Sequence, residues 1–96
     1  MKHIFDIDIA TEYGVNSAII FENIYFWIEK NKANKMNYHN GKYWTFNSID
    51  AFEVLFPYLT RKQIRVAIDK LLDSGLLEKG CYNQMAYDHT LWYTIT

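Results

Sequence analysis

Cysteine and proline are almost missing from this chain of 96 residues, which contains one of each. A single cysteine, Cys81, excludes an internal disulfide, so a hydrophobic core must hold the fold together. A long uncharged apolar run is also missing, because the most apolar stretch, SAIIFENIYFWI, is interrupted by Glu22. That stretch is too short to span a bilayer, and the N-terminal MKHIFDIDIA lacks the apolar core of a signal peptide. We therefore expect a soluble, cytoplasmic protein.

The chain also lacks an excess of positive charge, since its formal net charge is −1 at pH 7. The overall charge therefore gives no argument for nucleic-acid binding, which must depend on where the charges lie. Aromatic residues, in contrast, make up 18% of the chain. In so small a domain some of these rings are expected at the surface, where they favour contact with a partner.

The sequence shows no pattern typical of a catalytic or metal site. Cys81 and the three histidines have no metal-ligand spacing, and there is no serine nucleophile motif or phosphate-binding glycine loop. Asp6 and Asp8 alternate before an apolar pair, a position that favours helix capping over acid-base chemistry. We expect no cofactor, no metal and no enzymatic activity.

Helical spacing organises the first third of the chain. IDIATEYG predicts a short helix that ends at Gly14, and Asn16 is expected to cap a longer helix from Ser17 to about Lys30. The apolar stripe of this longer helix is wider than one core face requires. We expect the helix, with the N-terminal HIFDIDIA segment, to form either a homodimer interface or a docking surface for another domain. The candidate interface residues are Phe21, Tyr25, Phe26, Ile28 and, in the last expected strand, Trp92.

A hairpin and a short helix follow. Asn40-Gly41 within MNYHNGKYWTF predicts a β-hairpin, because both residues tolerate the positive φ of a type I′ turn. Asn47 or Ser48 is expected to cap a short helix, SIDAFEVLF, which Pro57 cannot continue. The strand KYWTF is expected to complete a small sheet.

The last third of the chain contains the strongest local signals. Thr60 and Gln63 have the spacing of a capping box, in which each side chain accepts a hydrogen bond from the other residue's backbone. Gly75 is expected to end the helix that they begin. Two strands, LLEKG and TLWYTIT, then follow, joined by the loop CYNQMAYDH.

This order of elements predicts an α+β fold, a winged helix-turn-helix with a small antiparallel sheet and an extra N-terminal helix. We expect one domain over residues 1–96. It comprises an N-terminal helical part (1–36), a hairpin strand and helix-turn-helix (37–75) and a wing (76–96).

The basic residues of the expected 60–74 helix lie off its apolar stripe and are predicted to point outward. In a helix-turn-helix protein the start of this second helix meets the major groove, where Arg binds guanine and Gln binds adenine. Free backbone amides at the helix start also suit a phosphate. The alternative is that these residues only solvate an exposed helix face. The candidate DNA-binding residues are Thr60, Arg61, Lys62, Gln63, Arg65 and Lys70.

The stretch YWTFNSIDAFEVLFPYLTRKQIRVAIDKLLDSGLL, followed by YDHTLWYTI, resembles a known family over about residues 41–95. The family is the N-terminal winged-helix domain of replisome-organiser or DnaD-like replication initiation proteins from phages and prophages of low-GC Gram-positive bacteria. The resemblance implies binding to double-stranded DNA at an origin-like site, and self-association during primosome assembly. It also implies helicase-loading partners, engaged by a C-terminal segment outside these 96 residues.

The resemblance adds the wing, from Asn83 to His89, to the candidate DNA contacts. Relatives often have arginine where this chain has His89, and a neutral histidine weakens the expected phosphate contact. Three functions stay open: a replication-type DNA-binding domain, a protein-interaction or oligomerisation winged helix with little DNA binding, and a small transcriptional regulator. The acidic balance favours the second function, and the third differs from the first only in the DNA it binds. The chain is either a fragment of a longer protein or a short gene product.

Overall fold

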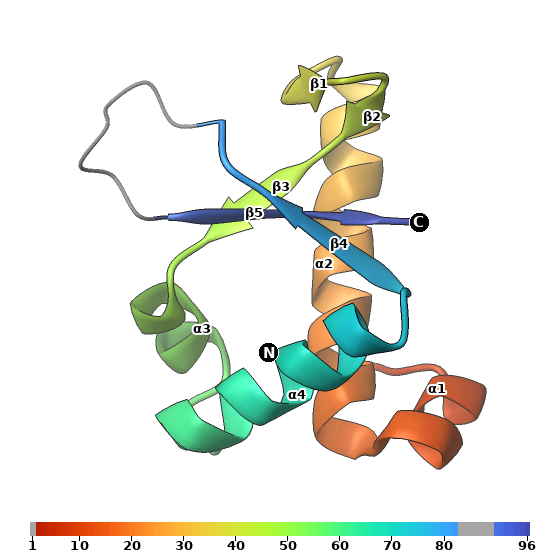
Figure 1. Ribbon diagram of the computed structural model, residues 1–96. Helices are drawn as coiled ribbons and strands as arrows, with labels where there is room; N and C mark the ends of the chain where they lie inside the picture. Colours follow the sequence, from red (N-terminus) through yellow and green to blue (C-terminus); the bar gives the residue numbers. More distant parts are fainter. Residues whose placement is uncertain (1, 83–89) are drawn as a thin grey trace.

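The structure is a computed structural model that describes residues 2–82 and 90–96. The α+β class expected from the sequence is confirmed, with a three-stranded antiparallel sheet in the order β3-β5-β4 and a separate two-stranded hairpin, β1-β2 (Figure 1). The elements are α1 (Ile7–Tyr13), α2 (Val15–Ala33), β1 (Tyr38–His39), β2 (Lys42–Tyr43), β3 (Thr45–Asn47), α3 (Ile49–Leu55), α4 (Arg61–Asp73), β4 (Leu77–Gly80) and β5 (Leu91–Ile95).

The two N-terminal helices meet at Gly14. Asp6 caps α1 by accepting hydrogen bonds from the backbone of Asp8 and Ile9, and α1 ends at Gly14, as expected. The expected cap at Asn16 is wrong, because α2 begins at Val15 and Asn16 lies inside its first turn. The φ of Gly14 is +94°, a conformation open to glycine, so this one residue both ends α1 and starts α2.

The hairpin forms at the expected turn, whereas the expected strand that follows it is divided. Asn40 and Gly41 have φ values of +52° and +76°, and they connect β1 to β2. The chain then continues into β3, which pairs with β5 so that Thr45 lies opposite Tyr93. The expected strand KYWTF is therefore divided, its start in the hairpin and its end in the larger sheet.

The helix caps of the C-terminal half are also confirmed. The Ser48 hydroxyl accepts a hydrogen bond from the Ala51 backbone at the start of α3. Both bonds of the Thr60–Gln63 capping box are present at the start of α4. Gly75 follows α4 with a φ of +84°, which suits a C-terminal glycine.

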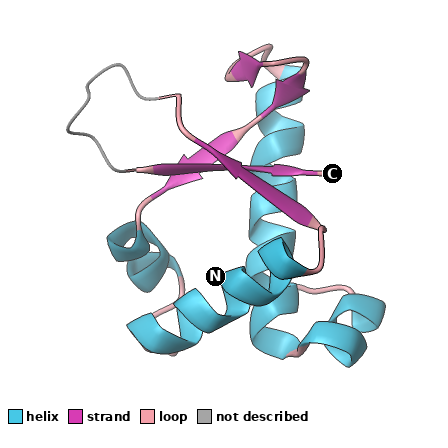
Figure 2. Ribbon diagram, viewed as in Figure 1, coloured by secondary structure: helices cyan, strands magenta, loops and turns pink. Residues whose placement is uncertain are grey.

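One core joins α2, α3 and α4 to a face of the three-stranded sheet. Figure 2 shows the sheet in front of α2, with α3 and α4 below it in this view. The Ser17 hydroxyl also ties α2 to α4, because it donates a buried hydrogen bond to the Ala67 carbonyl at 3.1 Å. The most deeply buried core side chains are Ile20, Ile24, Phe52, Phe56, Ile64, Leu71 and Tyr93. No helix in the described part of the chain is long and apolar enough to cross a membrane.

Candidate nucleic-acid interface

The first turn of α4 is fixed by its capping box. The Thr60 hydroxyl accepts from the Gln63 backbone N–H at 3.1 Å, and the Gln63 side-chain Oε1 accepts from the Thr60 N–H at 2.8 Å. Reading adenine bidentately requires both the oxygen and the nitrogen of a glutamine amide. The oxygen of Gln63 already serves the cap, so capping and the expected adenine contact compete for the same atom.

Arg61 forms two ion pairs with the preceding helix. Its Nη1 donates to the Asp50 carboxylate at 2.5 Å and to the Glu53 carboxylate at 2.6 Å. These hydrogen bonds raise the pKa of the Arg61 guanidinium, with Asp50 contributing most. The two carboxylates also offset the unfavourable placement of a cation at the positive end of a helix dipole. Arg61 thus links α3 to α4 and is not available in this conformation as a free base-reading group.

The other three candidate cations of α4 are exposed and lie on two sides of the helix. Lys62 and Lys70 line a hollow of about 340 Å³ together with the residues at the α1–α2 corner. Arg65 lines a different hollow, of about 400 Å³, with Ser48 of the α3 cap and Thr90 at the start of β5. Among the described residues, no carboxylate forms an ion pair with any of these three cations.

The charges on the exposed side of α4 are unevenly distributed along the helix. Its first turns present Lys62 and Arg65, whereas its last turns present Asp69 and Asp73 beside Lys70. A phosphate backbone is attracted to the first part and repelled by the carboxylates of the second. The cationic turn, which we define as Lys62 and Arg65 on the N-terminal half of α4, is therefore the part of this helix that best suits a polyanion.

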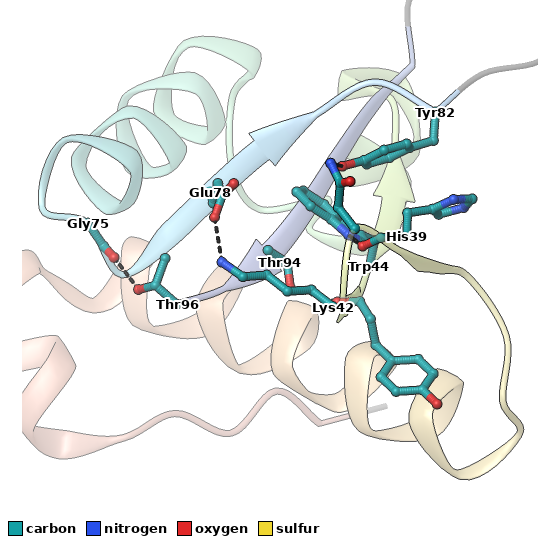
Figure 3. Close-up of polar contacts among 10 residues, drawn as sticks. His39, Lys42, Trp44, Gly75, Glu78, Tyr82, Thr94 and Thr96 are labelled. Carbon is teal, nitrogen blue, oxygen red and sulfur yellow. Dashed lines mark hydrogen bonds and ion pairs between the residues drawn. The ribbon is translucent and has the colours of Figure 1, made fainter.

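The foot of the expected wing rests on the β1-β2 hairpin. The Tyr82 ring stacks on His39, with centroids 4.4 Å apart and planes 7° apart, and its hydroxyl accepts a hydrogen bond from the Asn40 amide (Figure 3). Gly80 makes this packing possible, because a Cβ there would lie 3.0 Å from the Tyr82 ring and 3.1 Å from Trp44. The candidate contacts Asn83 and His89 lie outside the described residues.

The expected interface residues divide into an exposed and a buried group. Tyr25 and Phe26 are 46% and 57% exposed on the outer side of α2. Ile28 and Trp92, in contrast, are each only 8% exposed, and Phe21 packs partly against the core. Ile28 and Trp92 are covered by the chain itself, so they add little to a surface for another molecule.

Sequence reasoning missed two further features of these surfaces. Asp50 and Glu53, the partners of Arg61, are one helical turn apart on α3. Their spacing in the sequence places both carboxylates on one side of α3, which could have predicted an ion pair with the basic helix that follows. Trp27 is also at the surface, where its ring meets Phe26 edge-on and the Lys30 ammonium lies 4.9 Å from its centroid. The aromatic face, which we define as Tyr25, Phe26 and Trp27, consists of three consecutive exposed residues of α2 that line one hollow.

Within residues 2–82 and 90–96, no three His, Cys, Asp or Glu side chains are placed to hold a metal ion together. Comparison with protein-family models, with curated proteins and with solved structures gives no match for this chain. A functional proposal therefore depends on the geometry and on the sequence resemblance.

Proposed function

We propose that this chain is a winged-helix domain that binds double-stranded DNA through the N-terminal half of α4. The order α2-β3-α3-α4-β4-β5, with the sheet order β3-β5-β4, supports this proposal. In it, α3 and α4 form the helix-turn-helix, α4 is the recognition helix, and β4 and β5 are the strands of the wing. α1 is the extra N-terminal helix.

The observation that carries the proposal is the position of Lys62 and Arg65. Both are exposed and point away from the buried stripe of Ile64, Ala67 and Ile68, Lys62 toward the α1–α2 corner and Arg65 toward the start of α3. Because neither cation forms an ion pair with any described residue, each can neutralise a phosphate without first breaking such a pair. Lys70 adds a further phosphate contact, whereas Arg61 and Gln63 serve the fold in the absence of DNA.

The resemblance to phage replication proteins supports a role in replication initiation, with an origin-like duplex as the ligand. Such a role is non-enzymatic, belongs in the cytoplasm, and would recruit helicase-loading proteins through other parts of the assembly. A small transcriptional regulator would use the same surface on a different DNA site. The neighbouring genes would distinguish the two roles, because a cluster of replication genes favours replication initiation over transcriptional regulation.

A second candidate function, a protein-interaction winged helix with little DNA binding, is favoured by the ion pairs of Arg61 and by the aromatic face. The two functions make opposite predictions for a charge-removing variant of the cationic turn. If the domain binds only proteins, through α2, removing Lys62 and Arg65 changes neither its weak DNA binding nor its protein binding.

The test is the binding of a fluorescent DNA duplex, measured by anisotropy at low salt. We expect the Lys62→Ala/Arg65→Ala variant to bind at least about tenfold more weakly than the native chain, because two phosphate contacts are lost. A Lys32→Ala/Lys35→Asn control removes the same charge at the C-terminal end of α2, away from α4, and should bind within about twofold of the native chain. Equal weakening by both variants, or by neither, contradicts the proposal.

A further inference from the structure

The outer side of α2 carries an ordered row of three side chains. Glu22, Phe26 and Lys30 are spaced four residues apart, so they form one ridge along the helix surface. Phe26 is 57% exposed at the centre of this ridge. A carboxylate lies one turn before the ring and an ammonium lies one turn after it.

This ridge has opposite charges at equal distances from its centre. A two-fold axis beside Phe26 would place a second α2 antiparallel to the first and bring Glu22 opposite the partner's Lys30, and the reverse. Rows with four-residue spacing lie parallel when two helices cross at about −50°, the commonest packing angle in globular proteins. Charge complementarity and packing geometry are thus satisfied by the same arrangement.

The charged ends of the ridge have no ion-pair partner among the described residues. Lys30 is exposed, with its ammonium over the Trp27 ring, and Glu22 is half-buried. Beside the ridge, Ile4 is 69% exposed and lines an apolar hollow of about 450 Å³ with Tyr25 and Phe26. An aromatic and apolar centre with charged ends is the usual composition of a protein interface.

We propose that two copies of this chain form a dimer through antiparallel packing of α2, centred on Phe26 and oriented by the Glu22–Lys30 pairs. A second copy fits better than an unrelated partner because the ridge is complementary to itself. α4 packs on the core side of α2, and Figure 1 shows α4 and the sheet together in front of α2. The dimer therefore leaves both cationic turns open to solvent.

The dimer is tested by charge reversal in sedimentation equilibrium experiments without DNA, so its outcome does not depend on the proposed function. Glu22→Lys and Lys30→Glu each place like charges opposite one another, and we expect each variant to dimerise at least about tenfold more weakly than the native chain. An equimolar mixture of the two variants should recover the native dimerisation constant. In the mixed pair every reversed charge faces an opposite one.

Two matched controls separate this effect from a change in net charge. Glu12→Lys in α1 and Lys79→Glu in β4 change the charge equally at exposed sites off the ridge, and they should dimerise as the native chain does. Thermal unfolding by circular dichroism checks that each variant is folded. Lys30 is exposed, so Lys30→Glu is expected to disturb folding less than Glu22→Lys. If Glu22→Lys does not fold, the dimerisation constant of Lys30→Glu alone tests the proposal.

Three results would overturn the proposal. One is a native chain that stays monomeric at high micromolar concentration. Another is native-like dimerisation of the two single variants. The last is a mixture that associates no better than its components, which would indicate a dimer with a different register or a different face.

Discussion

The cationic turn of α4 and the aromatic face of α2 lie on helices that share one core, yet they depend on different forces. Lys62 and Arg65 interact through charge, which salt screens over about 10 Å. Tyr25, Phe26 and Trp27 interact through apolar area, which salt does not weaken. A chain with a formal net charge of −1 thus offers two chemically distinct surfaces, and the average composition hides both.

The two arginines of α4 differ in whether a carboxylate already holds them. Arg61 and Arg65 are one turn apart on α4, but Arg61 is held by two carboxylates of α3 and Arg65 has no ion pair among the described residues. The pairs of Arg61 are solvent-exposed and contribute little stability, because exposed pairs are typically worth below about 1 kcal/mol. Their larger effect is on anion binding, because they occupy the Arg61 guanidinium and leave that of Arg65 available.

The largest expected effect comes from removing a side chain on which both surfaces depend. Phe52 is fully buried, and its ring packs near Phe56 and Tyr93. We expect Phe52→Ala to lower the free energy of unfolding by about 3–5 kcal/mol in urea titrations, and to weaken DNA binding and dimerisation together. Val54→Ala, at an exposed position of the same helix, should change it by less than about 0.5 kcal/mol. If Phe52→Ala weakened only DNA binding or only dimerisation, the two surfaces would not depend on the same core.

An intermediate effect is expected at the start of α4. Thr60→Ala removes the hydroxyl that accepts from the Gln63 backbone, which should lower the free energy of unfolding by about 1 kcal/mol. Because the first turn of α4 then frays, DNA binding should weaken while dimerisation through α2 stays native. Thr60→Ser keeps a capping hydroxyl and should keep both properties. A Thr60→Ala variant that binds DNA normally would indicate that the capped turn is not the contact.

The smallest effect on stability is expected from freeing Arg61. Asp50→Asn/Glu53→Gln removes both ion-pair partners, and the free energy of unfolding should change by less than about 1 kcal/mol. DNA affinity should rise a few-fold, and the salt dependence should steepen by about one phosphate contact, since Arg61 becomes available. Asp8→Asn/Glu29→Gln removes the same charge at exposed sites that line neither hollow of the α4 cations. If both variants gained the same affinity, the gain would come from the change in net charge and not from the release of Arg61.

Local signals predicted most of the fold. The caps at Ser48 and Thr60, the Asn40-Gly41 turn and the terminal Gly75 are confirmed because each depends on a few adjacent residues. The start of α2 was predicted wrongly at Asn16. Asparagine is a good capping residue, but the positive φ of the preceding glycine lets the helix begin earlier.

Features that depend on packing between distant segments were harder to predict. The availability of Arg61 depends on where α3 lies relative to α4. Trp92 is covered by rings from β1, from β3 and from Tyr82 beyond β4, which come from separate segments of the chain. Helical periodicity identified the broad apolar stripe of α2 but not which of its residues the core covers. Ile28 and Phe26 are two residues apart, and only the structure distinguishes their exposure.

The salt dependence of duplex binding reports how many phosphates the cationic turn neutralises. A plot of log K against log salt concentration should have a slope of about −2 or steeper for the native chain, since each neutralised phosphate contributes about −0.9. The Lys62→Ala/Arg65→Ala variant should reduce the magnitude of that slope by about 2. A native chain that binds no duplex at low salt, or a slope that this variant leaves unchanged, would contradict the account.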